Sequence, residues 1–293
     1  MPRMDLTKSL IRAKSPCAAG FRWFVRHHED RGDYQELLDS LVAADRIDDA
    51  CWLLSQFGPT NAVLSVDAIE AKAVVFAGTI EVRGGIEVDT VLRAGRSIRC
   101  GGGLRAGGPV NVGEDIRVEG GLLSEGALDA GGDIHVAWGL EARAPVRCGG
   151  ELRAGWDIAC SESLDVAGGI VVGQDLRVEG EFACRKGVRA GGCIEAGASV
   201  RAEQGIQCGG SIHARWHLDT GWGIRAGDSI TAGGSIRAGE SLLATGELRA
   251  GEGYGVFAGL SVPRDTWDTS ARVSASVRPE ALMSGCWAGF GAA

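Results

Sequence analysis

The sequence predicts a mainly β protein in which a parallel β-solenoid follows a small α-helical domain. Three observations support this fold class. An apolar residue recurs at every sixth position through most of the chain. The chain has 47 glycines and only 7 prolines among 293 residues, which is typical of many tight turns. The segment before the repeat is poor in glycine and has the apolar spacing of amphipathic helices.

Residues 1–60 are predicted to form the small helical domain. Asp33 is placed to cap one helix and Asp48 to cap a second, which Gly58 and Pro59 would end. Their apolar residues recur at steps of three and four: Tyr34, Leu37, Leu38, Leu41 and Val42, then Ala50, Trp52, Leu53, Leu54 and Phe57. A further short helix is expected within 21–30, and residues 61–79 are expected to lead irregularly into the solenoid.

The six-residue repeat occupies residues 80–253 and predicts the solenoid. From Ile80 to Leu248, steps of six reach 29 positions, and every one is Ile, Leu, Val or Phe. Two residues after each lies a small residue, usually Ala, Val or Cys. Residues two apart lie on the same face of a strand, so each repeat directs one large and one small side chain inward. The three remaining residues form a corner.

Three such strands and three corners make a coil of about 18 residues, and successive coils stack as parallel sheets. The 172 residues from Ile80 to Gly251 give roughly nine and a half coils, or a rod on the order of 45 Å long. A helix is excluded because a period of 3.6 would spread the apolar residues around its circumference. The order of large then small residues favours a right-handed coil.

Residues 254–293 depart from the repeat and are predicted to form a C-terminal cap that includes Trp267, Trp287 and Phe290. An open solenoid end exposes unpaired backbone groups and an apolar cross-section. With the helical domain before the repeat, both ends are expected to be covered. Covered ends argue against free end-to-end polymerisation.

The composition narrows the choice of compartment and partner. The 38 acidic and 30 basic side chains give a net charge of −8, which makes a nucleic-acid or membrane partner improbable. The amino end has no apolar run of signal-peptide length, and no later stretch has the length of a membrane span. Nine scattered cysteines fit a reducing compartment. We therefore expect a cytoplasmic protein of bacterial type.

Repeats such as AGGSIRAGESLLATGELRAG, residues 232–251, resemble those of bactofilins and related polymer-forming β-helix proteins. The resemblance covers the solenoid only. It implies a non-catalytic, right-handed β-helix that joins end to end into filaments with short disordered tails. The chain departs from that pattern at both ends, where it has a helical domain and a predicted cap.

Two sets of outward residues are candidates for binding a partner. Stacking places every third outward strand residue in one line along the rod, and one such line is rich in arginine. The four tryptophans of the repeat lie at corners, where a large aromatic side chain is exposed. The candidate partner-binding residues are Arg99, Arg117, His135, Arg153, Arg189, Arg225, Trp138, Trp156, Trp216 and Trp222. The alternatives are that corner acids such as Glu114, Asp115 and Glu119 neutralise the arginines, and that loops or helices cover the tryptophans.

The sequence contains no pattern that predicts a catalytic centre, a metal site or a cofactor. Hexapeptide-repeat acyltransferases use a histidine between coils, but His135 and His213 are 78 residues apart and therefore lie on different faces of an 18-residue coil. His27 and His28 have no cysteine or carboxylate cluster at ligand spacing. The interior cysteines serve as compact apolar groups.

These observations predict a non-enzymatic solenoid that binds another protein. An immunity or inhibitor protein that neutralises a toxin by direct contact is the more specific hypothesis. A self-assembling, bactofilin-like cytoskeletal scaffold is the alternative, and a hexapeptide-repeat acyltransferase is the third class.

Overall fold

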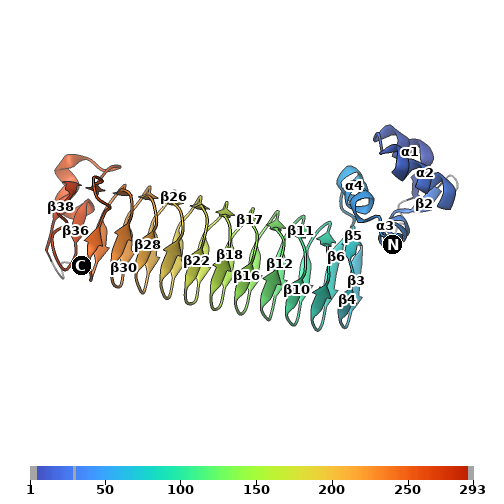
Figure 1. Cartoon of the computed structure of the whole chain (residues 1–293), viewed down its shortest axis with the longest axis horizontal. Helices are drawn as coiled ribbons and strands as arrows, with labels where there is room; N and C mark the ends of the chain where they lie inside the picture. Colours follow the sequence, from blue (N-terminus) through green and yellow to red (C-terminus); the bar gives the residue numbers. More distant parts are fainter. Residues whose placement is uncertain (1–4, 29–30, 290–293) are drawn as a thin grey trace.

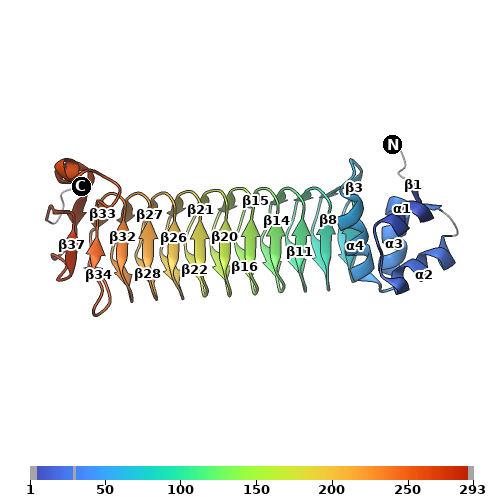
Figure 2. The same cartoon turned by 90° about the horizontal axis from the view of Figure 1, so that it is seen from above.

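The structure is a computed structural model that describes residues 5–28 and 31–289. It is a long straight rod with the helical region at one end and the C-terminal segment at the other (Figures 1 and 2). The rod is a parallel β-solenoid of about 12 coils with three short strands in each. The predicted fold class is therefore confirmed.

Within the described residues, the N-terminal region consists of four helices and one antiparallel strand pair. The pair is β1 (Asp5–Thr7) and β2 (Arg31–Asp33), and the helices are α1 (Lys8–Ala13), α2 (Ala18–His27), α3 (Tyr34–Ala43) and α4 (Ile47–Phe57). Among the described residues, the longest helix is α4 with 11 residues, and no helix meets the length and apolar content of a bilayer span.

A side chain caps the first turn of α3, whereas α4 has no side-chain cap. Asp33 caps α3 as predicted, since its side chain accepts hydrogen bonds from the backbone N–H groups of Gln35 and Glu36. The predicted cap at Asp48 is wrong, because α4 begins at Ile47 and Asp48 lies inside its first turn. An acidic residue is still favourable there because it faces the positive end of the helix dipole. Gly58 ends α4 with a φ of +75°, which favours glycine.

The solenoid comprises three sheets, named here by their described strands. The 13-strand sheet contains β3 (Val63–Val66), β6 (Thr79–Val82), β9 (Ile98–Cys100), β12 (Ile116–Val118), β15 (Ile134–Val136), β18 (Leu152–Ala154), β21 (Ile170–Val172), β24 (Val188–Ala190), β27 (Ile206–Cys208), β30 (Ile224–Ala226), β33 (Leu242–Ala244), β36 (Arg272–Ser274) and β38 (Cys286–Trp287).

The other two sheets follow the same stacking within the described residues. The 12-strand sheet contains β5 (Val74–Phe76), β8 (Leu92–Ala94), β11 (Val110–Val112), β14 (Leu128–Ala130), β17 (Val146–Cys148), β20 (Leu164–Val166), β23 (Phe182–Cys184), β26 (Val200–Ala202), β29 (Leu218–Thr220), β32 (Ile236–Ala238), β35 (Val256–Phe257) and β37 (Leu282–Ser284). The 11-strand sheet contains β4 (Ile69–Ala71), β7 (Ile86–Val88), β10 (Leu104–Ala106), β13 (Leu122–Ser124), β16 (Leu140–Ala142), β19 (Ile158–Cys160), β22 (Leu176–Val178), β25 (Ile194–Ala196), β28 (Ile212–Ala214), β31 (Ile230–Ala232) and β34 (Leu248–Arg249).

The solenoid begins before the six-residue repeat does. β3, β4 and β5 lie within 61–79, the segment expected to be irregular, and they pair in parallel with β6, β7 and β8. Their large inward residues Leu64, Ile69 and Val74 follow one another at steps of five. A search at steps of six therefore misses this first coil, although the alternation of inward and outward residues is the same.

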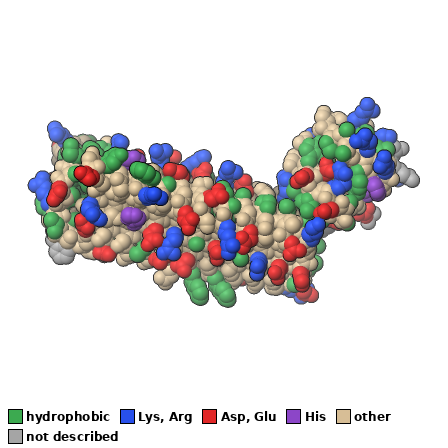
Figure 3. Space-filling view, viewed as in Figure 1, with side chains coloured by type: hydrophobic (Ala, Val, Ile, Leu, Met, Phe, Trp, Pro, Cys, Tyr) green, Lys and Arg blue, Asp and Glu red, His purple; other side chains and the backbone are tan. Residues whose placement is uncertain are grey.

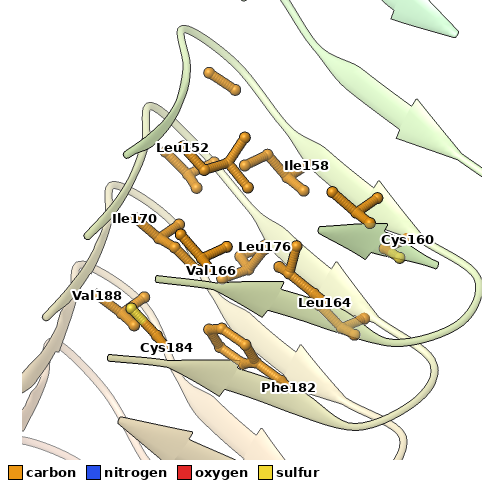
Figure 4. Packing of buried hydrophobic residues seen from close by; sticks show 14 of the residues in the cluster. Leu152, Ile158, Cys160, Leu164, Val166, Ile170, Leu176, Phe182, Cys184 and Val188 are labelled. Atoms are coloured by element: carbon orange, nitrogen blue, oxygen red, sulfur yellow. The ribbon is translucent and has the colours of Figure 1, made fainter. Parts of the chain in front are cut away.

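The interior is a continuous apolar column (Figure 4). Large residues such as Leu164, Phe182 and Val188 are fully or almost fully buried, and each stacks on its counterpart one coil away. Burial of one such side chain stabilises the fold by about 1.5–3 kcal/mol. The buried hydroxyl of Ser124 bonds to the carbonyl oxygens of Gly108 and Gly126, so it is satisfied inside the column.

The C-terminal segment adds the last described strands of two of the three sheets. β35 and β37 extend the 12-strand sheet, and β36 and β38 extend the 13-strand sheet. Between them lie the 3-10 helix η1 (Arg264–Thr266) and α5 (Trp267–Ser270). Trp287 packs partly buried against the column, while Phe290 lies outside the described residues. The sequence missed this continuation because the loops between the strands are longer here.

The helical region packs on the side of the first coil. The outward side chain of Val75 in β5 is part of the helical core, and the Gln35 side chain bonds to the backbone of the same strand. The inward residues Leu64, Val66 and Ile69 remain half-buried. The cover predicted for the N-terminal end is therefore incomplete, because the helices lie over β5 and leave the interior residues of β3 and β4 partly exposed.

Candidate protein-binding surface

The predicted arginine line lies on the outer face of the 13-strand sheet. Parallel pairing puts Arg99 beside Arg117, Arg117 beside His135, and His135 beside Arg153, one coil apart each time. The line continues through Val171, Arg189, Gln207 and Arg225 to Leu243. The structure therefore brings the six predicted residues of this line onto one face.

In the N-terminal half of this line, acidic neighbours pair with the arginines. Arg99 forms an ion pair with Glu81 at 2.7 Å, and Arg153 pairs with Glu151 at 2.5 Å. Arg117 pairs with Glu119 at 2.8 Å, and this hydrogen bond lowers the pKa of Glu119. The alternative that acids neutralise the line is thus realised in these coils.

The two other corner acids named as neutralisers have different partners. Glu114 forms an ion pair with Arg96. The carboxylate of Asp115 accepts a hydrogen bond from the backbone N–H of Asp133 at 2.9 Å. In the part of the chain that the structure describes, neither acid pairs with an arginine of the line.

In the C-terminal half, no acidic side chain of the described residues pairs with the arginines. Arg189 and Arg225 form no ion pair within the described part of the chain, and neither does Lys186 at the adjacent corner. These three cations lie along a groove of about 590 Å³ on the 13-strand sheet. Trp222, with 51% of its surface exposed, lies on the same groove. This basic groove is the strongest candidate site on the molecule.

Glycines shape the basic groove. Gly169, Gly187, Gly205 and Gly223 occupy the last corner position before β21, β24, β27 and β30, and they line the groove. Earlier coils carry Ser97, Asp115, Asp133 and Glu151 at the same position. The corner conformation therefore accepts other residues, and none of the four glycines has a positive φ. Their missing side chains leave a trough between the corner residues and the outward strand residues.

Two groove residues escaped the sequence analysis, namely Lys186 and Gln204. Both occupy the corner column that contains Trp222, at 18-residue spacing from it. Alignment of the corners at this period, as was done for the strand residues, would have found them together with the glycine row. The sequence therefore contains the signal for this column at its corner positions.

The four predicted tryptophans lie at three different corners. Trp138 and Trp156 stack one coil apart, with ring centroids 5.9 Å apart and an angle of 12° between the rings. Trp216 and Trp222 lie at the two other corners. All four are exposed. Neither the helical region nor a loop covers them, and Figure 3 shows hydrophobic side chains that stand out from one edge near the middle of the rod.

A second groove lies on the 11-strand sheet. It has a volume of about 900 Å³ and borders Trp138. Glu70, Glu87 and Glu141 line it together with Arg105 and Leu123. This groove has acidic character, opposite to that of the basic groove.

The histidines and cysteines do not form a reactive centre among the described residues. His135 lies on the 13-strand sheet and His213 on the 11-strand sheet, where His213 bonds to Thr231. Burial raises the pKa of Cys148 and of Cys208 to about 11, so these thiols stay protonated. No group of three potential metal ligands occurs in the described ranges.

Residues 4–58 match the family model of the YdhT N-terminal domain. This match covers the helical region and stops before the solenoid. Comparison with curated proteins and with solved structures found no match. No bactofilin model matches the chain, so the resemblance seen in the repeats holds at the level of the parallel β-solenoid.

Proposed function

We propose that this protein is a non-catalytic binding rod that holds another protein in its basic groove. One observation carries the proposal: Lys186, Arg189 and Arg225 have no acidic partner within the described residues, although the arginines of earlier coils on the same sheet do. Unpaired arginines beside an exposed tryptophan are the residue types that contribute most to protein interfaces.

The rigidity of the solenoid supports a binding role. Every strand of the groove is hydrogen-bonded on both sides, and the inward residues beneath it are buried. A surface that is already ordered loses little conformational entropy on association. Tight binding by the groove therefore requires no rearrangement of the rod.

The more specific form of the proposal is an inhibitor or immunity protein that blocks a toxin in the bacterial cytoplasm. An inhibitor of this kind acts by occupying a surface, which suits a rigid rod. The test is co-expression with the products of neighbouring genes. Rescue from a toxic product by the wild-type protein, and loss of rescue in an Arg189→Glu/Arg225→Glu variant, are expected.

The binding role itself is tested by site-specific photo-crosslinking in the native host. A photoreactive residue at Gln207, inside the groove, is expected to yield a defined cross-linked protein. The control position is Ala183, which faces outward on the 12-strand sheet. The purified partner must then bind the wild-type rod and lose affinity for the Arg189→Glu/Arg225→Glu variant. Equal cross-linking at both positions would contradict the proposal.

A self-assembling scaffold is the second candidate function, favoured by the partly exposed interior of the first coil. Leu64, Val66 and Ile69 belong to the inward register but are only half-buried. Apolar groups and strand edges at a solenoid end are surfaces on which another coil can stack. Light scattering and electron microscopy of the purified protein distinguish the candidates. Filaments that disappear in a Leu64→Glu variant would establish the scaffold, and a monodisperse monomer would remove it.

A further inference from the structure

The corners of the rod contain a recurring hydrogen bond that the basic groove lacks. In earlier coils of the same edge, the carboxylate of Asp115 accepts from the backbone N–H of Asp133 at 2.9 Å. The carboxylate of Asp133 accepts in the same way from Glu151 at 2.7 Å. Each acid thus satisfies the corner N–H of the next coil.

A second edge of the rod follows the same pattern from Asp157 onward, whereas its earlier coils have Gly85, Gly103, Gly121 and Gly139 at this position. There Asp157 accepts from the N–H of Asp175, and Asp175 accepts from Cys193 at 2.7 Å. Cys193, Ser211 and Ser229 continue this ladder with a thiol and two hydroxyl groups. The corner N–H is therefore a donor that the chain repeatedly pairs with an acceptor side chain of the preceding coil.

In the basic groove the acceptors are missing because the corner residues are glycines. The backbone N–H groups of Gly187, Gly205 and Gly223 form no hydrogen bond within the described structure. They lie at 18-residue spacing and so form one row along the groove, beside the unpaired cations Lys186 and Arg189. The groove therefore offers unpaired corner donors beside cations that have no acidic partner within the described residues, and the Gln204 and Glu240 side chains are the acceptors nearest to this row.

We propose that the occupant of the basic groove is an acidic, extended segment of the partner protein. Its carboxylates accept from the glycine N–H row, as the carboxylates of Asp115 and Asp133 accept from corner N–H groups in earlier coils, and they also pair with Arg189 and Arg225. An apolar side chain of the segment packs on Trp222, Val171 or Leu243, which line the same groove. This inference rests on the proposed binding role and specifies its chemistry.

The distance between Arg189 and Arg225 determines how far apart the two carboxylates of the bound segment must be. Arg189 and Arg225 lie two coils apart, which is about 10 Å along the rod. An extended chain advances about 3.3 Å per residue, so two carboxylates about three residues apart reach both arginines. Of the acids of the groove, Glu151 pairs with Arg153, and the carboxylate of Glu240 lies at the Gly223 end of the row, with Oε2 3.9 Å from the position that a Cβ on Gly223 would take.

The same donors would accept phosphate, but the groove favours a protein segment. Only three cations of the groove have no acidic partner within the described residues, and the whole protein has a net charge of −8. Both features are unfavourable for binding a nucleic-acid backbone. The groove also has apolar side chains at Val171, Trp222 and Leu243. An acidic peptide with an apolar residue matches both features.

The test uses a fluorescein-labelled extended peptide of about eight residues that contains one leucine and two aspartates three residues apart. Its binding to the full-length protein is measured by fluorescence anisotropy. We expect saturable binding that weakens at least tenfold when asparagine replaces both aspartates. An Arg189→Glu/Arg225→Glu variant is expected to lose this binding. The matched control is Arg201→Glu/Arg237→Glu, which reverses two arginines at the same spacing on the 12-strand sheet and is expected to bind normally.

A second variant fills the trough at Gly187 and leaves all cations of the groove unchanged. Gly187→Asp reproduces the residue found at position 133, and its carboxylate can accept from the N–H of Gly205. The added Cβ would lie 3.2 Å from the carbonyl oxygen of Gly205, and the same corner position carries Asp115 and Asp133 in earlier coils. We expect an unchanged circular dichroism spectrum and at least a tenfold loss of peptide affinity.

The outcomes separate this inference from the proposed function. Equal binding of the aspartate and asparagine peptides, or tighter binding of a single-stranded oligonucleotide, would contradict the proposal that the groove binds an acidic protein segment. If the cross-link at Gln207 still identifies a partner whose binding requires the groove, the binding role stands and only its chemistry is wrong. Absence of both the cross-link and peptide binding would remove both proposals.

Discussion

The side-chain oxygen of Gln35 accepts a hydrogen bond from the backbone N–H of Ala77 at 2.9 Å. The amide nitrogen of the same side chain donates to the carbonyl oxygen of Val75 at 3.2 Å. Val75 belongs to β5, the terminal strand of its sheet among the described residues. A single glutamine of α3 thus takes the place of a neighbouring strand and fixes the helical region to the rod.

Replacement of Gln35 by leucine is expected to loosen this junction. The change leaves a buried N–H and a carbonyl without partners, which costs about 1–3 kcal/mol of stability. Hydrogen exchange should increase at β5 and in α3 but remain slow in the middle of the rod. Gln56→Leu is the matched control, because the Gln56 side chain makes no hydrogen bond within the described structure. Uniform exchange in both variants would contradict the assigned role.

The interior of the solenoid should be most sensitive at Phe182, its largest fully buried residue. Phe182→Ala is expected to lower the free energy of unfolding by about 3–5 kcal/mol because it leaves a cavity between Leu164 and Val200. Phe182→Leu should cost less, since most of the volume is retained. Urea denaturation measures both values. Equal losses in the two variants would contradict a close-packed interior at this position.

The buried thiols predict a loss of stability in alkaline solution. Burial raises the pKa of Cys148 and of Cys208 to about 11 in the folded protein, above the ordinary value of about 9. Between these pH values the unfolded chain loses thiol protons that the folded chain keeps, so ionisation stabilises the unfolded state. The free energy of unfolding should therefore fall as pH rises from about 9 to 11.

Matched variants isolate this contribution. Cys148→Ala/Cys208→Ala is expected to show a shallower fall over the same pH range, measured by denaturant titration. Cys17→Ala, at an exposed position, should follow the wild-type slope. Identical slopes in all three proteins would assign the alkaline loss to other groups.

The stacked tryptophans are expected to stabilise one another modestly. A double-mutant cycle with Trp138→Ala and Trp156→Ala should give a coupling energy of about 0.5–1.5 kcal/mol from thermal unfolding. Because this pair lies at a different corner from the basic groove, the double variant should bind the acidic peptide as the wild type does. Loss of peptide binding would place the pair within the binding surface.

Coenzyme A is expected to give no heat of binding in isothermal titration calorimetry. An acyltransferase of the hexapeptide class requires a histidine between coils that meets the acyl donor. Here His135 and His213 lie on different sheets, and His213 is engaged with Thr231. A saturable heat of binding that is lost in the His213→Ala variant would support the acyltransferase function.

The sequence by itself determined the solenoid, its coil length and the composition of each face. This was possible because strand alternation and an uninterrupted six-residue period fix which residues point inward, whatever the rest of the chain does. The line from Arg99 to Arg225 follows from the same arithmetic. The sequence also predicted that Asp33 caps α3, because a capping aspartate bonds only to backbone N–H groups two and three residues after it.

Only the tertiary structure decided which of these residues are available to a partner. Whether Arg117 is paired and Arg225 is unpaired depends on the side chains that flank each of them on the folded surface, and the linear pattern treats the two alike. The first coil was missed because its steps of five fall outside the period. The position of the helical region on β5 depends on Gln35 and Val75, which come together only when the coil has closed.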